Sequence, residues 1–389
     1  MENVLALDPA DALLVSATFL LCIFATWITR GGAINSVHSF GESPIGDTFL
    51  IGLLLMAAFS AAVIVARRRH LRSEFEIEAL ASREAGFLYT TLLFVGAAVL
   101  VFLGTLFPSL SQTVLGREIA WGTESYDRIT RILAPLLLLL LGVCPVLGWR
   151  RSAEGKLQRA LMPSLIAALV TALLVALLLG GLSYAVLGFA LVAFVAVTIL
   201  SEFYGGWRVR VVRGEGAVTA LVRLVGRNRR RYGGYVVHLG VLLIVLGITG
   251  QSFYHSSDRV ALDPGDSVTV GPYTLQDVDS GTEETRAKRR FYAALDVYRD
   301  GQLQFTMHPE RNFHWNVQQW VTEVALRSNP VEDLYVLLLS LEDDRLGTFE
   351  IIINPLMMWL WIGGAVATLG TLLAVWPAAR DGAPVRPRA

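Results

Sequence analysis

RRRYGGYVVHLGVLLIVLGITG, residues 229–250, contains three features that together decide the class of fold. It opens on three arginines, continues as an apolar run long enough to cross a bilayer, and carries one histidine, His238, inside that run. At about 1.5 Å per residue, His238 lies roughly 10 Å beyond the basic edge, within the hydrocarbon layer. An ionisable side chain at this depth is costly, which makes His238 a candidate functional residue.

The rest of the chain has the composition of an integral membrane protein. Of its 389 residues, 54% are hydrophobic and only 17% are charged, which is too little charge for the surface of an ordinary soluble domain. The net charge of zero gives no argument for a nucleic-acid partner. Apolar runs of about 17–25 residues can cross the bilayer as helices. Eight such runs are present, at about 12–28, 48–66, 86–107, 131–149, 160–180, 182–201, 234–251 and 355–376.

The loops between these runs set the expected orientation, because Lys and Arg are retained on the cytoplasmic side. One set of loops contains seventeen basic residues, eight of them between residues 208 and 231, and the opposite set contains four. The sequence therefore predicts a polytopic α-helical protein of the plasma (inner) membrane with about eight transmembrane helices. Both termini are expected in the cytoplasm.

The character of the chain changes for about a hundred residues between the last two spans. VALDPGDSVTVGPYTLQDV (260–278) and FYAALDVYRDGQLQFTM (291–307) alternate β-branched and aromatic with polar residues and contain turn sequences. This pattern predicts a small β-rich domain on the extracytoplasmic side. The expected organisation is a membrane core of seven helices over 1–251, a β-rich domain over 252–353, and a last helix with a cytoplasmic tail over 354–389.

Glycines accompany His238 on its helix. Gly234 lies one turn before His238 on the same face, and Gly240, Gly247 and Gly250 thin the rest of the helix. A large flat partner or another backbone can therefore approach closely. A buried neutral imidazole with room beside it suits an iron porphyrin. The alternative is a neutral imidazole that hydrogen-bonds to a neighbouring helix, with glycines that serve helix packing alone.

A second histidine, His38, lies in the loop GGAINSVHSF (31–40) on the expected outer side. A short loop that is held at both ends by spans favours a binding role. For a hydrocarbon core about 30 Å thick, His38 and His238 are separated by roughly 20 Å in depth, whereas two imidazoles on one metal hold their nitrogens about 4 Å apart. The sequence therefore predicts two sites, and each histidine needs a different partner ligand.

Two further groups are weaker candidates. His255, at the outer end of the seventh span, is the best candidate within the chain to join His38. The basic cluster RAKRR, residues 286–290, is either an ordinary solvated loop or a surface for propionates, acidic partners or lipid headgroups.

Six stretches spread over nearly the whole chain carry a family resemblance. They are TRGGAINSVHSF (29–40), LASREAGFLYTTLLFVGAAVLVFLGTLFP (80–108), APLLLLLLGVCPVLGW (134–149), NRRRYGGYVVHLGVLLIVLGITG (228–250), EDLYVLLL (332–339) and NPLMMWLWIGGAVATLG (354–370). In sequence and in order they resemble the cytochrome c maturation haem-lyase family of the CcmF/NrfE type. The resemblance implies an activity that joins haem vinyl groups to the two thiols of a CxxCH motif in apocytochrome c.

The resemblance also implies a role for each candidate residue. His38 is similar to the external axial ligand of the transient haem that the chaperone CcmE delivers, and it is the candidate catalytic residue. His238 is similar to an axial ligand of a resident haem b within the membrane, with Gly234 beside it in the cofactor site. The implied partners are CcmE, apocytochrome c and other maturation subunits.

One family feature is missing from this sequence. The tryptophan-rich segment of the WGxWWxWD type does not occur, so the chain resembles the C-terminal part of a split lyase that works with an N-terminal half chain. Two other interpretations stay open. A non-catalytic assembly scaffold predicts that substitution of His38 or His238 leaves the haem content unchanged. A transporter predicts internal repeats, which are not evident.

Overall fold

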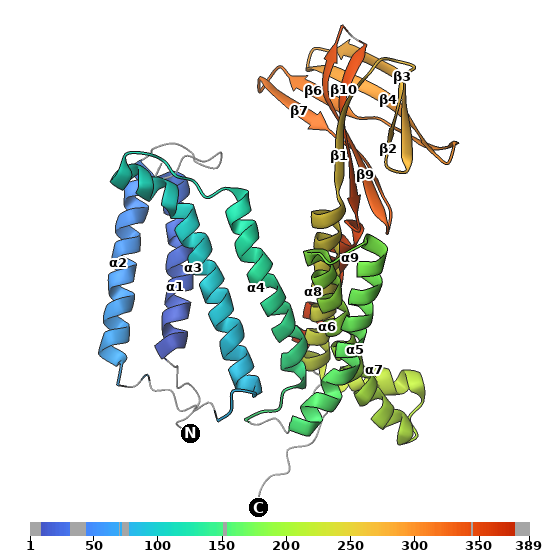
Figure 1. Cartoon of the computed structure of the whole chain (residues 1–389). Coiled ribbons are helices and arrows are strands. Elements are labelled where there is room, and N and C mark those ends of the chain that lie inside the picture. The colour runs from blue at the N-terminus through green and yellow to red at the C-terminus, as the bar shows by residue number, and fades with distance from the viewer. Residues whose placement is uncertain are drawn as a thin grey trace, which may run out of the picture. The chain divides into compact units, whose positions relative to one another are not determined.

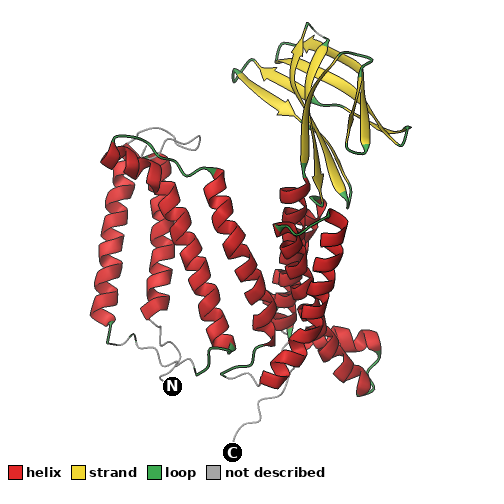
Figure 2. Cartoon of the chain, in the orientation of Figure 1, coloured by secondary structure: helices red, strands yellow, loops and turns green. Residues whose placement is uncertain are grey.

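The computed structural model describes residues 9–31, 44–69, 71, 78–150, 154–343 and 345–377. His38 lies outside the described residues. The chain forms two units, one of Met1–Leu140 with Leu147–Glu154 and the other of Leu141–Val146 with Gly155–Ala389. Figures 1 and 2 show the helices and strands of both units.

The first unit contains long apolar helices. They are α1 (Pro9–Arg30), α2 (Pro44–Arg67), α3 (Arg83–Leu115) and most of α4 (Thr123–Val143). α3 begins where the Ser82 hydroxyl caps it by accepting from the Ala85 N–H at 3.2 Å, and it ends at Gly116, whose positive φ of 68° stops the helix. Local capping residues therefore set both ends of the longest helix.

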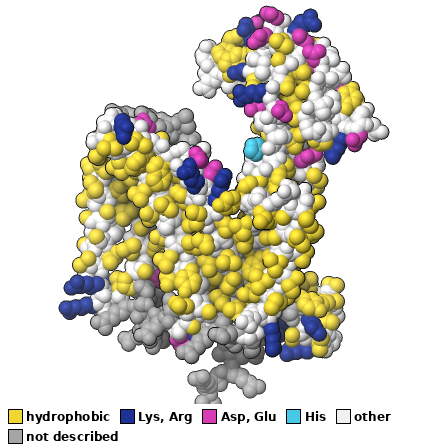
Figure 3. All heavy atoms as spheres, in the orientation of Figure 1, with side chains coloured by type: hydrophobic (Ala, Val, Ile, Leu, Met, Phe, Trp, Pro, Cys, Tyr) yellow, Lys and Arg dark blue, Asp and Glu magenta, His cyan; other side chains and the backbone are white. Residues whose placement is uncertain are grey.

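The second unit begins with the last residues of α4 and a short 3₁₀ turn (Cys144–Val146), and it contains the remaining helices. They are α5 (Glu154–Leu179), α6 (Tyr184–Val212), α7 (Ala217–Arg227), α8 (Arg229–Tyr254) and α9 (Met358–Val375). Within the described part of the chain, eight helices are long and apolar enough to cross a membrane. Hydrophobic side chains cover their visible sides in Figure 3. The predicted number of transmembrane helices is confirmed, whereas α7 is an eleven-residue helix in a segment expected as a loop.

A β-domain, residues 256–355, lies between α8 and α9, as predicted. Its strands are β1 (Ser256–Leu262), β2 (Ser267–Val270), β3 (Tyr273–Glu284), β4 (Lys288–Arg299), β5 (Gln302–Met307), β6 (Glu310–His314), β7 (Gln319–Glu323), β8 (Ala325–Ser328), β9 (Glu332–Glu342) and β10 (Leu346–Pro355). One antiparallel sheet has the order β1-β10-β9-β8 and the other the order β2-β3-β4-β6-β7, with β5 paired to β4. Alternating apolar residues of both sheets form one buried core, which includes Leu275, Leu295, Val336 and Phe349.

The β-domain joins the membrane helices through two neighbouring strands. α8 ends at Tyr254 and β1 begins at Ser256, while β10 ends at Pro355 and α9 begins at Met358. β1 and β10 are paired antiparallel, with Ser256 opposite Ile353. A helix pair therefore continues directly into a strand pair, as Figure 1 shows for α8, β1 and α9.

Glycines bring the backbones of α8 and α9 into contact. A Cβ atom at Gly240 would lie 2.5 Å from the Ala367 nitrogen, and one at Gly363 would lie 2.6 Å from the Gly240 oxygen. Gly233 and Gly370 make similar contacts further along the two helices. Small residues allow this close approach, and the packing it creates stabilises helix pairs in lipid.

Candidate functional site

His238 lies half-buried on α8, as the sequence predicts for a residue within a span. Its Nδ1 atom is buried and has no hydrogen-bond partner among the described residues. A buried polar atom without a partner is uncommon and calls for an explanation, such as a ligand. Among the described residues, Nδ1 therefore makes no interhelical hydrogen bond of the kind that the packing interpretation expects. The imidazole is a residue type that could hold an iron porphyrin.

The glycines of α8 separate into two groups. Gly240, Gly247 and Gly250 would each clash with backbone atoms of α9 or of the segment leading into it if they carried a Cβ atom, so these three serve helix packing. Gly234, one turn from His238, has no atom within 4 Å of the position that its Cβ would take. Open space therefore adjoins His238 at the glycine that the sequence places on its face.

α6 forms the wall beside this part of α8. The Tyr235 hydroxyl donates to the Glu202 carboxylate at 3.3 Å. The two helices run antiparallel, because Gly188 near the start of α6 lies beside Thr249 near the end of α8. Their register places Ile199, which is fully buried, level with His238.

A polar cluster that the sequence reading missed lies between His238 and the basic end of α8. The Arg231 Nε donates to the Tyr235 hydroxyl at 3.0 Å, and the same guanidinium forms an ion pair with Glu202. Phe203 and Tyr232 pack against Tyr235 with ring centroids 5.9 and 5.7 Å away. The available signal was an acid inside an apolar run on α6, together with an arginine and a tyrosine four residues apart. In this cluster the positive charge of Arg231 and the negative charge of Glu202 neutralise each other.

The remaining histidine candidate is held by its own helix. His255 caps the end of α8, and its Nδ1 lies 3.1 Å from the Gln251 carbonyl oxygen. Within the described ranges, no group of three or more His, Cys, Asp or Glu side chains is arranged to hold a metal ion. The predicted pairing of His255 with His38 involves a residue outside the described ones and stays a prediction.

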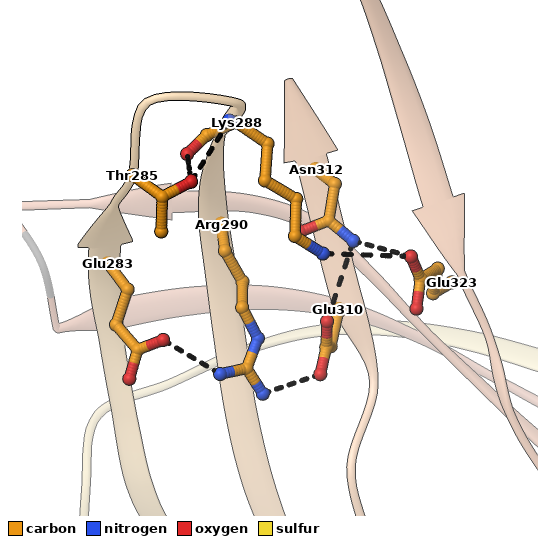
Figure 4. A network of polar contacts seen from close by, with 7 residues as sticks. All are labelled: Glu283, Thr285, Lys288, Arg290, Glu310, Asn312 and Glu323. Atoms are coloured by element: carbon orange, nitrogen blue, oxygen red, sulfur yellow. Dashed lines mark hydrogen bonds and ion pairs between the residues drawn. The ribbon is translucent and has the colours of Figure 1, made fainter. Parts of the chain in front are cut away.

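The basic cluster 286–290 lies mostly on β4 of the β-domain and is neutralised there. Arg290 donates to Glu283 at 2.9 Å and to Glu310 at 2.5 Å, so its charge is shared between two neighbouring strands. These contacts hold the pKa of Arg290 above its ordinary value, the hydrogen bond to Glu310 contributing most. Figure 4 shows the network, which comprises Glu283, Thr285, Lys288, Arg290, Glu310, Asn312 and Glu323. The network ties strands together, and it leaves less charge for an external anion than the sequence suggests.

Glu310→Gln is expected to lower the stability of the protein at pH 7 by about 1.5–3 kcal/mol, the range for a hydrogen bond to a charged group. The hydrogen bond from Arg290 lowers the pKa of Glu310, so its contribution is present above the unfolded pKa and disappears as the pH falls through the lower folded value. The difference between variant and wild type in thermal unfolding should therefore vanish at strongly acidic pH.

Glu310→Gln and wild type must be compared with each other at each pH, because burial raises the pKa of Asp277 and of Asp333 in both proteins. Those two carboxyls favour the folded state as the pH falls, in the opposite direction to Glu310. A difference between variant and wild type that stayed constant from neutral to acidic pH would contradict the assigned role of Glu310.

Comparison with known proteins gives a consistent result for the chain. Residues 253–355 match the family model described as CcmF C-terminal beta-sandwich. The cytochrome c-type biogenesis protein CcmF of Pseudomonas aeruginosa is 28% identical over 364 residues, covering 93% of this chain and 54% of that protein. CcmF of Escherichia coli is 27% identical, covering 94% and 54%, and the biogenesis protein NrfE of Haemophilus influenzae is 25% identical, covering 92% and 54%.

The same similarity holds for the fold. A solved structure of a protein called cytochrome c haem lyase CcmF superposes with a TM-score of 0.74 and 24% identity, covering 95% of this chain and 55% of that one. The chain spans about half the length of the curated relatives it matches, and that half is the C-terminal one.

Proposed function

We propose that this chain, a homologue of the C-terminal half of CcmF-type proteins, is the part of a cytochrome c haem lyase that holds haem for attachment to apocytochrome c. The observation that carries the proposal is the unpartnered, buried Nδ1 of His238 beside the open space at Gly234. The similarity to CcmF-type proteins supports the same assignment.

Within the membrane, the residues act by holding and orienting. A resident haem b would be held by His238, and Gly234 would leave room for its ring. When bound, the haem supplies one-electron redox chemistry, whose potential depends on the axial ligand and on burial. The neighbouring Glu202 and Arg231 neutralise each other and so keep an uncompensated charge away from the site.

At the outer face, the reaction adds each CxxCH thiol across a haem vinyl group, forming a carbon–sulfur bond while the thiol proton goes to the other vinyl carbon. His38 would hold the iron of the delivered haem substrate, which fixes the vinyl groups where the thiols arrive. Such positioning converts an encounter of separate molecules into an effectively unimolecular step. The chaperone CcmE, apocytochrome c and the tryptophan-rich half of the lyase are the proposed partners.

The proposed location is the inner membrane, with both termini in the cytoplasm and the β-domain on the periplasmic side. The arginine-rich end of α8 supports this orientation, because basic residues are retained in the cytoplasm and the β-domain follows the opposite end of the helix. We also propose the membrane core over 1–251, the β-rich domain over 252–353 and the last helix with its tail over 354–389.

The test is the reduced-minus-oxidised visible spectrum of the chain purified in detergent with the proteins that copurify. His238→Ala is expected to remove a bis-histidine b-type spectrum, whereas His38→Ala retains it and abolishes haem attachment to apocytochrome c. His308→Ala, at an exposed position in the β-domain, is the matched control. Absence of haem from every preparation that contains a tryptophan-rich partner would instead support the assembly-scaffold interpretation.

A further inference from the structure

α7 is an amphipathic helix that lies against the basic end of the membrane helices in Figure 1. One side is anchored: Ala220 and Leu224 are buried, and Leu224 lies against Gly206 of α6. Other apolar side chains stay uncovered, with Val218 78% and Val222 64% exposed. A short helix with exposed apolar residues and arginines in its sequence has the character of helices that lie at a membrane surface.

A groove of about 550 Å³ separates α7 from the end of α9. Leu221, Val222 and Val225 line it from α7, and Leu372 and Trp376 line it from α9. Leu372 and Trp376 are 52% and 65% exposed. The groove is thus continuous with the apolar surface that the membrane helices present to lipid, and it lies at the depth where a tryptophan marks the interface.

One arginine lines this groove, and three more lie close to the lining residues in the sequence. The guanidinium of Arg229 lines it and uses one N–H to donate to the Pro377 carbonyl at 2.6 Å, which leaves further donors of its five. Arg223, Arg227 and Arg230 are exposed, and within the described part of the chain they form no ion pair. An apolar groove that has an arginine in its lining is complementary to an anionic amphiphile.

We propose that this groove binds one anionic phospholipid, with an acyl chain along Leu221 and Leu372 and the phosphate at Arg229. Basic residues at a membrane surface attract anionic headgroups by about 1 kcal/mol each. The remaining C-terminal residues are a poorer occupant, because residues 378–389 contain three arginines and one aspartate and would repel Arg229. A bound lipid would seal α7 against α9 at the end of α8 that leads toward His238.

The test is native mass spectrometry of the full chain in detergent, titrated with phosphatidylglycerol and, separately, with phosphatidylcholine. We expect one saturable phosphatidylglycerol, with phosphatidylcholine at least about tenfold weaker. Arg229→Gln should weaken phosphatidylglycerol binding roughly fivefold, the equivalent of one lost arginine. Arg213→Gln, which removes an exposed charge at the same end but outside the groove lining, should change it less than about twofold.

A second variant tests the groove without removing charge. Gly226 lines the groove and has no atom within 4 Å of its Cβ position, so Gly226→Leu can fill the space without a clash. It should lower binding of the lipid at least about tenfold. Gly205→Leu is the matched control, because that glycine also has open space and lies outside the groove.

Three results would overturn the proposal. The first is equal binding of the two phospholipids, and the second is displacement of phosphatidylglycerol by millimolar inorganic phosphate. The third is a mass spectrum that shows a dimer of the chain, together with a Gly226→Leu variant that loses the dimer but still binds the lipid. A variant is included only if its thermal transition equals that of the wild type, so that a loss of lipid binding is separated from a loss of fold.

Discussion

Gly363→Leu is expected to abolish the packing of α8 on α9, whereas the same substitution at the next residue, Gly364, leaves the fold intact. A Cβ atom at Gly363 would lie 2.6 Å from the Gly240 oxygen and 2.7 Å from the Ile244 nitrogen, and these backbone atoms cannot move aside without breaking α8. We expect a loss of about 3 kcal/mol or more, at the upper end for overpacked sites.

The measurement is the yield of monodisperse protein in detergent, together with its thermal transition. Gly364 is the natural control, because it lies in the same turn of α9 and carries the same helix propensity, yet its Cβ position has no atom within 4 Å. Equal losses at the two positions would show that leucine disturbs α9 itself and that contact with α8 is not the cause.

Gly234→Leu is expected to remove haem from the chain while leaving the protein folded, if His238 holds haem as proposed. The Cβ position of Gly234 has no atom of the described residues within 4 Å, and a leucine there would occupy the space one turn from the imidazole. A steric cost of about 3 kcal/mol corresponds to a roughly hundredfold loss of affinity. The haem content per protein, from the pyridine haemochrome absorbance, gives the result directly.

Gly205→Leu serves as the control for this substitution, because Gly205 also has an open Cβ position in a membrane helix. The thermal transitions of both variants should match that of the wild type. Full haem content in a folded Gly234→Leu protein would contradict the assignment of this space to the cofactor, even if His238→Ala removes the haem.

Features that depend on local pattern were predicted from the sequence. The membrane helices were predicted from the length of the apolar runs, and the β-domain from turn residues and from the alternation of apolar and polar residues. The structure confirms both. α7 was missed because its single buried side, at Ala220 and Leu224, is short and lies among arginines, where charge suggests a loop. The position of Tyr235 beside Glu202 depends on the register of two helices, which no local pattern contains.

The glycines of α8 show the same limit within one helix. Composition alone predicted that a backbone or a flat cofactor would approach, and it could not assign a partner to each glycine. The structure separates them: a Cβ atom at Gly240 would clash with α9, whereas one at Gly234 would meet no atom of the described residues within 4 Å. His238 was identified from its depth, which is a sequence property, whereas its unpartnered Nδ1 became visible only when the surrounding helices were in place.

The direct passage of α8 into β1, and of β10 into α9, makes the β-domain an insertion into a helical hairpin. Its entry and exit strands, β1 and β10, are paired with each other, so the domain is connected to α8 and α9 through a two-stranded stem. A twist applied to the domain by a docked protein would reach α8 as torsion, without a flexible linker to absorb it. Under the proposed function, docking of apocytochrome c on the β-domain would therefore act directly on the helix that carries His238.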